Sequence, residues 1–391
     1  MSEPFLDIGF ASLHKYGEEL CGDHVEIKTN REGSTVIVLA DGLGSGVKAS
    51  ILSTLSAKII STMIAEEMSV EECVNTIAAT LPVCGERNIA YSTFTILRIK
   101  NNREAELYQY DNPPAVFIRS NDAFPYPIEQ EEMGGKLIYR TKMEFIPGDT
   151  LVLFSDGALY AGEGTALNYG WQQEDIVTLL KKLCPPLRSA KTISTLLLEH
   201  IGLLYGGKPG DDTTVCTVRL RSSAAVNLFI GPPKNSDDDE AALSAFFKQS
   251  GKHIICGGTT ASIAARYLKH PLDEGCAPGL DEDIPPLSKL AGTDLVTEGI
   301  ITLGRVHQYI EDFIGKNQLY AEWGIVTDGA SLLAQALLEE ATDIHVFIGR
   351  AENAANRRAE LLSGFSCKEE LLDSLLNLLR RAGKRVTVQY F

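Results

Sequence analysis

The sequence is poor in features that would cross-link a small domain or hold zinc. Its eight cysteines are scattered over 391 residues, and no two of them form a C-x-x-C pair. This spacing argues against a zinc site and against a disulfide framework, so we expect most of the thiols to be buried and reduced. The chain opens without a basic, then apolar, leader, and no window approaches the roughly 20 apolar residues that span a bilayer. We therefore expect a cytoplasmic protein with no membrane partner.

Positive charge is also scarce. The chain has 36 Lys and Arg against 52 Asp and Glu, which gives a formal net charge of −16. Such a balance repels nucleic acid, so we expect no nucleic-acid partner. The length and the 44% hydrophobic content are sufficient for two domains, each with its own hydrophobic core. The segment 221–225 breaks a strand pattern before a new one starts at Val226, which predicts one domain over 1–221 and a second over 226–391.

What the sequence does contain is a set of acidic turns beside apolar runs. Asp41, Asp156 and Asp211 each adjoin a short β-branched or apolar run bounded by glycine, and Asp23 lies in a fourth such turn. Carboxylates held at strand ends can converge on one point, and magnesium and manganese prefer oxygen ligands. A single Asp-Gly pair is usually an ordinary turn, which is our interpretation of Asp328. The set together predicts a metal site.

The order of these turns and their flanking residues resembles the PPM family of metal-dependent serine/threonine phosphatases, in its bacterial SpoIIE-type branch. The resemblance runs from about residue 5 to residue 220. Four separate segments in the family's order carry it, and together they are far more specific than one short motif. They are Leu39 to Ala49 (LADGLGSGVKA), Asp111 to Ala115 (DNPPA), Pro147 to Gly157 (PGDTLVLFSDG) and Gly210 to Val215 (GDDTTV).

Carried over residue by residue, the resemblance implies a site with two divalent metal ions, manganese or magnesium. Asp41 would bridge the ions, with the Gly42 carbonyl on one of them and Asp156 and Asp211 on the other. Asp23 would complete the metal site and orient metal-bound water, which makes Asp23 and Asp41 the expected catalytic residues. Such a pair of ions lowers the pKa of a water and stabilises the phosphoryl oxygens during an in-line attack, so no covalent phosphoenzyme is required.

One position departs from the family pattern. Many eukaryotic members carry a histidine two residues after the bridging aspartate, whereas this chain has Leu43. A general acid contributes about 10² to 10⁴ in rate, so we expect protonation by metal-bound water or a slower enzyme. His24 is a substitute acid that the sequence leaves open, beside the plainer interpretation of a solvent-exposed loop histidine.

For the first domain, the resemblance implies an α+β fold, the four-layer αββα sandwich of PPM phosphatases. A helical pattern opens after the first acidic turn, and its apolar residues recur every four positions, which predicts a core-facing stripe. The stripe consists of Val47, Ile51, Leu55, Ile59 and Met63, widened by Leu52, Ile60 and Ile64.

The second domain has no recognised relative. Its strand-like and helix-like runs alternate, which predicts an α/β domain with a mainly parallel sheet. The segment from Ile254 to Thr260 is a strand, a glycine turn and a helix start, which can hold a phosphate or carboxylate at the helix N-terminus. The alternative is a tight turn with a threonine cap and no ligand. The stretch from Pro271 to Pro286, rich in glycine, proline and acids, is typical of a loop.

The sequence therefore predicts a bacterial signal-transduction enzyme: a metal-dependent phosphoserine/phosphothreonine protein phosphatase whose substrate is a phosphorylated regulatory protein. Two alternatives stay open. One is a regulatory binding protein with weak or no phosphatase activity, and the other is a phosphatase of small phosphorylated metabolites. The second domain could bind a small molecule, dock a protein or form a homodimer, and its residues do not choose among these roles.

Overall fold

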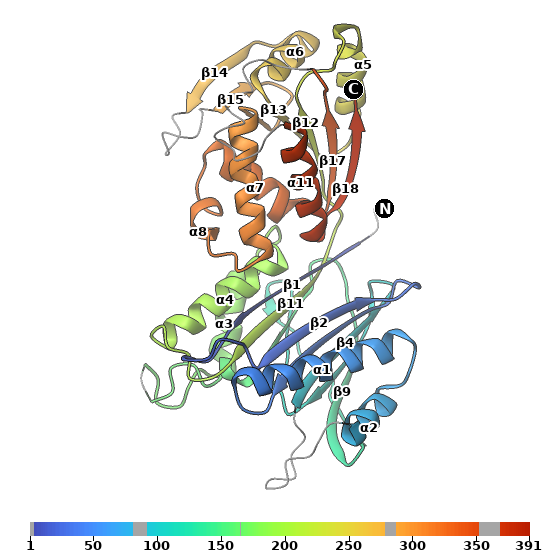
Figure 1. Ribbon diagram of the computed structural model, residues 1–391, viewed down its shortest axis with the longest axis vertical. Helices are drawn as coiled ribbons and strands as arrows, with labels where there is room; N and C mark the ends of the chain where they lie inside the picture. The colour runs from blue at the N-terminus through green and yellow to red at the C-terminus, as the bar shows by residue number, and fades with distance from the viewer. Residues whose placement is uncertain (1–3, 81–91, 165, 278–286, 352–367) are drawn as a thin grey trace. The chain divides into compact units, whose positions relative to one another are not determined.

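The computed structural model describes residues 4–80, 92–164, 166–277, 287–351 and 368–391 (Figure 1). The chain divides into two compact units, Met1–Ser222 and Ser223–Phe391. The division falls inside the segment in which the sequence places the domain boundary. The sheets and the hydrophobic clusters of the two units are separate.

The N-terminal unit is built on two antiparallel sheets. Their strand orders are β1-β11-β10-β6-β7 and β2-β3-β4-β5-β9-β8. The first sheet consists of β1 (Phe5–Leu13), β11 (Thr213–Arg221), β10 (Thr150–Phe154), β6 (Val116–Arg119) and β7 (Asp122–Ala123). The second consists of β2 (Asp23–Thr29), β3 (Thr35–Gly42), β4 (Ser92–Lys100), β5 (Glu104–Tyr110), β9 (Lys136–Glu144) and β8 (Glu129–Met133).

Helices cover the outer face of each sheet. Apolar residues of α1 and α2 form one core with the six-stranded sheet, and those of α3 and α4 form another with the five-stranded sheet. These helices are α1 (Gly46–Ala65), α2 (Val70–Thr80), α3 (Gln173–Leu183) and α4 (Ala190–Leu204), and a short turn, η1 (Asp156–Ala158), follows β10. A third core lies between the two sheets. The expected αββα sandwich is therefore confirmed.

Strand β3 shows how the sequence builds these layers. Val36, Val38 and Ala40 lie in the core beneath α1 and α2, whereas Ile37 and Leu39 lie in the core between the sheets. Successive side chains of a strand point to opposite faces, so a continuous apolar run is buried on both sides. All five residues are fully buried. Strand β3 is thus an interior strand, and packing on both of its faces fixes the position of its end.

Helix α1 buries a different face from the predicted one. Val47, Ile51 and Leu55 are 61%, 54% and 44% exposed, so the predicted stripe is wrong at its first three positions. An α-helix has 3.6 residues per turn, so residues four apart drift by about 40° at each step and leave a common face within a few turns. The buried face instead combines small and apolar residues: Gly46, Ala49, Leu52, Ser53, Ser56, Ala57, Ile60, Ser61, Ile64 and Ala65.

Over the described part of the chain, α1 is the one helix whose length and apolar composition would allow it to cross a membrane. It has 20 residues and a mean hydropathy of 1.3, which departs from the expectation that no window of the chain approaches such a span. Its residues Ala57, Ile60 and Ile64 are fully buried against the six-stranded sheet. The core helix of a folded domain passes the same test, and this packing accounts for the composition of α1.

The C-terminal unit has one mixed sheet, with strand order β14-β15-β16-β13-β12-β17-β18. Strands β16, β13, β12, β17 and β18 run parallel, while β14 and β15 are antiparallel at one edge. The strands are β12 (Ala225–Ile230), β13 (Lys252–Cys256), β14 (Leu272–Ala277), β15 (Leu287–Leu290), β16 (Leu295–Thr297), β17 (Asp343–Ile348) and β18 (Arg385–Tyr390). The expected mainly parallel sheet is confirmed. The loop expected from Pro271 is wrong over β14, and positions 278–286 lie outside the described residues.

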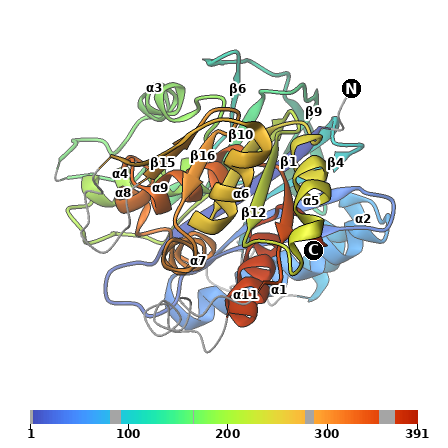
Figure 2. The same ribbon diagram turned by 90° about the horizontal axis from the view of Figure 1, so that it is seen from above.

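Helices follow the parallel strands of this sheet (Figure 2). Apolar residues of α5 and α6 share a core with β12, β13 and β17, and α7 packs against α11 and α9. These elements are η2 (Ser236–Asp238), α5 (Asp239–Phe247), α6 (Gly258–Leu268), α7 (Ile300–Ile314), α8 (Tyr320–Trp323), α9 (Gly329–Ala334), the π-helical η3 (Gln335–Glu340) and α11 (Lys368–Arg381). The chain adds strands on one side of β12 and then on the other, which makes the unit a doubly wound α/β domain.

Candidate metal centre

Strand β2 begins, and strand β3 ends, with a carboxylate at the same edge of the six-stranded sheet. On β3, Ile37 and Leu39 face the core between the sheets, and Asp41 is the next residue of that series. On β2, Val25 faces the same core, and Asp23 is next in its series. Asp23 and Asp41 are also direct partners in the β2–β3 register. Because directly paired residues share a face, both carboxylates border the core between the sheets.

The five-stranded sheet contributes Ser155 to the same cluster. This residue follows β10, and its Oγ donates to Asp23 Oδ2 over 2.7 Å. The same Oγ accepts the backbone N–H of Thr214 on β11 over 2.9 Å. Asp23 is 6% exposed, and its second oxygen, Oδ1, is buried without a hydrogen-bond partner among the described residues. A carboxylate fixed on one oxygen and unsatisfied on the other is ready to accept from a donor or to ligate a cation.

The carboxylates of this edge act on one another. Burial raises the pKa of Asp41, and the charges of Asp23, Asp156 and Asp211 raise it further. Burial also raises the pKa of Asp23, against the hydrogen bond from Ser155. Burial and the charge of Asp211 raise the pKa of Asp156. The structure thus brings all four predicted aspartates into one electrostatic cluster, in which a bound cation would favour the charged forms.

The rotamers of these carboxylates do not themselves define a coordination sphere. Over the described part of the chain, no three or more His, Cys, Asp or Glu side chains stand as a group that could hold a metal ion. The donor set nevertheless fits a hard divalent cation, because it offers several carboxylates, a backbone carbonyl and a buried, unpartnered Asp23 oxygen. The metal assignment therefore rests on the chemistry of the donors.

Gly42, the predicted carbonyl ligand, is required by the close passage of helix α1. A Cβ atom at this position would overlap the backbone carbonyl oxygen of Ala49. The backbone N–H of Gly42 donates to the Gly22 carbonyl over 3.2 Å, which ties the end of β3 to the turn that carries Asp23. The glycine thus lets helix and metal-site turn approach closely, as only a residue without a side chain can.

Sequence reasoning missed two charged residues at this edge. Asp212 is 3% exposed, its Oδ1 accepts the backbone N–H of Lys15 over 3.0 Å, and its Oδ2 is buried without a partner among the described residues. Its charge raises the pKa of both Asp23 and Asp211, while the charge of Lys15 lowers that of Asp211. A signal for Asp212 existed, because it lies two residues before Thr214 and so continues the inward series of β11. No sequence signal marked Lys15.

The two positions considered for a general acid do not place a proton donor at the carboxylates. His24 neighbours Asp23 on β2 and so lies on the opposite face of the strand. Its Nε2 lies 3.0 Å from Glu26 Oε2, which holds the ring away from the cluster. Leu43 is 39% exposed and has no proton to give. The structure therefore disfavours His24 as the substitute acid.

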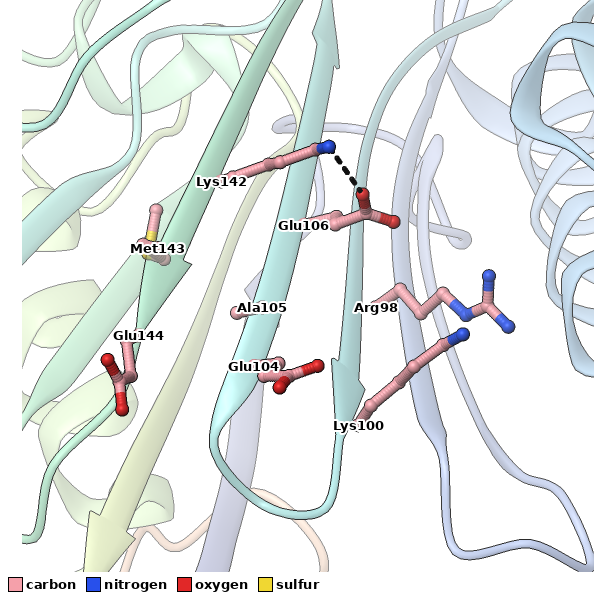
Figure 3. Close-up of a pocket in the computed structure, with 8 residues that line it drawn as sticks. All are labelled: Arg98, Lys100, Glu104, Ala105, Glu106, Lys142, Met143 and Glu144. Carbon is pink, nitrogen blue, oxygen red and sulfur yellow. Dashed lines mark ion pairs between the residues drawn. The ribbon is translucent and has the colours of Figure 1, made fainter.

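A separate hollow of about 510 Å³ lies over β4, β5 and β9 (Figure 3). It is lined by Arg98, Lys100, Glu104, Ala105, Glu106, Lys142, Met143 and Glu144. Its cations have acidic partners, since Arg98 pairs with Glu67 and Lys142 Nζ lies 3.9 Å from Glu106 Oε1. None of the predicted site residues lines it, so this hollow is not the metal centre.

The αββα sandwich with aspartates at the ends of neighbouring strands of both sheets defines a phosphatase domain of the PPM class. Residues 31–221 match the model of the family described as Stage II sporulation protein E (SpoIIE). The N-terminal unit therefore belongs to the SpoIIE family of protein serine/threonine phosphatases, as its motifs predicted. Comparison with curated proteins gave no match.

Solved structures of related domains are similar to part of the chain. The phosphatase domain of SpoIIE from Bacillus subtilis has 19% identity and a TM-score of 0.43, over 56% of this chain and 94% of that one. The RsbU and RsbW domains of a Mycobacterium tuberculosis protein have 15% identity and a TM-score of 0.47, over 63% and 70%. RsbX in complex with magnesium has 20% identity and a TM-score of 0.39, over 55% and 95%. The family assignment rests on the family model and not on these neighbours.

Proposed function

We propose that the protein is a metal-dependent phosphatase that removes phosphate from a phosphoserine or phosphothreonine of a regulatory protein. One observation carries the proposal: Asp23 and Asp41 are direct partners on one sheet, and the charges of Asp156 and Asp211, which flank strands of the other sheet, act on Asp41. Such a cluster of carboxylates is unfavourable without a cation, because burial and like charge both oppose ionisation. This unfavourable cluster of carboxylates lies where a metal-dependent phosphatase needs cations.

Divalent ions held at this edge, manganese or magnesium, would supply Lewis-acid stabilisation and an activated water for an in-line attack. The residues of the chain would divide the remaining work. Asp41, Asp156, Asp211 and the Gly42 carbonyl would hold the cations, and Asp23 would orient the attacking water. Ser155 keeps Asp23 in place for that role through its 2.7 Å hydrogen bond.

The surface beside this edge bears on the nature of the substrate. Leu43 beside it, and Val47 and Ile51 in the first turns of α1, expose apolar side chains. A pocket that recognises a small metabolite encloses most of its surface, whereas exposed apolar side chains beside a site are typical of a surface that docks a protein. We therefore favour a phosphoprotein over a small phosphorylated metabolite as the substrate.

The test is hydrolysis of a phosphoserine peptide and of an aryl phosphate by the full chain, in EDTA and with manganese, magnesium or calcium added. Asp156→Asn serves as the site variant. We expect turnover only with manganese or magnesium, and at least a tenfold preference in kcat/KM for the peptide over sugar phosphates. The variant should lower kcat and demand more metal for half-maximal rate.

Two results would count against the proposal. Turnover in EDTA equal to that with manganese would remove the metal from the mechanism. A folded chain without turnover on any substrate and with any metal would favour a regulatory binding protein.

A further inference from the structure

A crevice opens at the carboxyl ends of the parallel strands of the C-terminal unit. It has a volume of about 80 Å³ and is lined by residues at and after the ends of β12, β13 and β16, by Ala351 after β17 and by Lys368 at the start of α11. The chain leaves β12 towards β13 and β16 and later returns to its other side with β17. Ligands of doubly wound sheets bind at such a reversal of strand order, outside the carboxyl ends of the strands.

Two helices begin at this crevice without a side-chain cap. Helix α6 has Gly257 as its N-cap, with φ of +119°, and α7 has Gly299, and no side chain caps either helix. The first N–H groups of a helix have no partner within the helix, and the macrodipole adds positive potential there. A Cβ at Gly258 would meet nothing within 4 Å, so the first residue of α6 borders open space. The crevice is therefore suited to an anion.

A buried, unsatisfied hydroxyl supplies independent evidence for a ligand. Thr260, the third residue of α6, is 1% exposed, and its Oγ1 has no hydrogen-bond partner among the described residues. Thr260 is one of the residues that line the crevice. Leaving a buried hydroxyl unpaired costs about 1–3 kcal/mol, so native proteins usually satisfy such groups. A ligand oxygen in the crevice would satisfy this one.

Two charged side chains refine the chemistry of that ligand. Lys368 lines the crevice, and its Nζ donates to the Gly349 carbonyl over 3.0 Å, which leaves further N–H donors of its ammonium group. Glu298 also lines it, and its Oε2 is buried without a partner over the described part of the chain. An anionic group suits the lysine and the helix N-termini, whereas the glutamate requires a donor such as a hydroxyl.

We propose that this crevice binds a small phosphate ester that also carries hydroxyl groups, such as a sugar phosphate or a nucleotide. The phosphate accepts from the N–H groups of α6, from Thr260 Oγ1 and from Lys368, and a hydroxyl of the same molecule donates to Glu298. The volume of about 80 Å³ holds the phosphate group, and the remainder of the ester extends out of the crevice. This site is independent of the metal centre and of the proposed phosphatase activity.

Titration calorimetry of the full chain tests the proposal, in EDTA so that the metal centre does not bind phosphate. The probes are inorganic phosphate, glucose 6-phosphate, AMP and, without a phosphate, glucose and adenosine. We expect at least one ester to bind about tenfold or more tightly than inorganic phosphate, and the two unphosphorylated probes not to bind. Absence of binding by all three phosphates would overturn the proposal. Equal binding of phosphate and both esters would overturn the assignment of an ester.

Two variants and a matched control locate the site. Gly258→Asp places a carboxylate where the phosphate should lie, and acidic residues are favourable in a first helical turn, so folding should persist while ester binding weakens at least tenfold. Thr260→Val removes the unpaired hydroxyl and should weaken binding about tenfold, since a hydrogen bond to a charged group contributes about 1.5–3 kcal/mol. Thermal melts verify that each variant is folded.

The control is Thr302→Val in α7. Thr302 is also the third residue of its helix, is 1% exposed and has an unpartnered Oγ1 among the described residues, but it is not among the residues that line the crevice. This control should bind the ester like the wild type. Unchanged binding in Gly258→Asp, or equal loss in Thr260→Val and Thr302→Val, would show that the ester binds elsewhere or that any change in these helices disturbs it.

Discussion

Two Asp-Gly pairs of this chain look alike in sequence and have opposite surroundings. Asp41-Gly42 ends β3 of the N-terminal unit, and Asp328-Gly329 precedes α9 of the C-terminal unit. Asp328 is surrounded by donors: its Oδ1 accepts the N–H groups of Ala330 and Ser331, each over 2.9 Å, and its Oδ2 accepts the Ser331 hydroxyl over 2.7 Å. Asp41 is surrounded by other carboxylates, which raise its pKa beyond the effect of burial.

The difference separates a structural aspartate from a functional one. A buried carboxylate with several donors stabilises the fold in its charged form, whereas a buried carboxylate among like charges destabilises it. The first needs no ligand, and the second gains stability when a cation binds. The pair Asp41 and Asp328 therefore offers matched substitutions in one chain, the same residue type before a glycine in both cases.

Substitutions of Asp41 and Asp328 should differ most in their effects on turnover. Asp41→Asn should lower kcat at least about 10²-fold with manganese, the loss typical of removing one group that stabilises a transition state. Asp328→Asn should leave kcat within about twofold, because Asp328 lies in the other unit and caps a helix. Steady-state hydrolysis of a phosphoserine peptide measures both. Similar losses in the two variants would mean that Asp41 acts through the fold and not through chemistry.

The next largest effect should be on the stability that metal binding adds to the N-terminal unit. At a free manganese concentration of 100 times its Kd, binding should stabilise the N-terminal unit by about 2.7 kcal/mol, and Asp41→Asn should remove most of this gain. The chain has one tryptophan in each unit, Trp171 and Trp323, both buried. Denaturation of a Trp323→Phe chain therefore follows the N-terminal unit by fluorescence. An equal gain in Asp41→Asn would place the metal elsewhere.

The sequence could separate these two pairs only partly. Asp41 stands in an apolar run and in an order of motifs that predicted both the sandwich and the family, which the family model confirms. Asp328 lacks such a context, and its interpretation as local turn chemistry is confirmed by its cap. Which carboxylates share a cluster depends on contacts between strands far apart in the chain. Ser155 and Asp23, 132 positions apart, show why their hydrogen bond could not be predicted.

Helix α1 shows a second limit. Its apolar pattern predicted a core-facing helix correctly, but the spacing of Val47 and Ile51 pointed to the wrong face. The buried face relies on small residues such as Ala49 and Ser53 that let the helix approach β2 and β3 closely. Hydrophobic periodicity cannot find such a face, because alanine and serine add little to an apolar pattern. Close approach is visible only once the sheet beneath the helix is known.

Alanine substitutions of the two glycines, Gly42 and Gly329, should differ by a smaller margin in their effects on stability. Gly42→Ala would push a Cβ into the Ala49 carbonyl, so the turn or α1 must shift, at a typical cost of about 1–3 kcal/mol. At Gly329 a Cβ would stand 3.3 Å from a Leu287 methyl and 3.4 Å from Thr297 Cγ2. Small shifts of these side chains relieve that contact, so Gly329→Ala should change stability by less than about 1 kcal/mol. Urea denaturation of each unit, read from its own tryptophan, compares them.

Gly42→Ala should also weaken manganese binding, since the shifted turn carries the predicted carbonyl ligand. A variant as stable as the wild type and with unchanged metal affinity would show that the approach of α1 does not hold the site.

The smallest effect, and the most specific, is in stability without metal. Asp328→Ala leaves the N–H groups of Ala330 and Ser331 without their cap and should cost the C-terminal unit about 0.5–2 kcal/mol. Asp41→Ala, in EDTA, should cost the N-terminal unit nothing or raise its stability, because it removes a charge that its neighbours oppose. Fluorescence of Trp323 in a Trp171→Phe chain and of Trp171 in a Trp323→Phe chain reports each unit separately. If both alanine variants destabilised their units equally in EDTA, Asp41 would be a structural aspartate like Asp328. An opposite sign for the two changes would identify Asp41 as a residue whose surroundings are arranged for a cation.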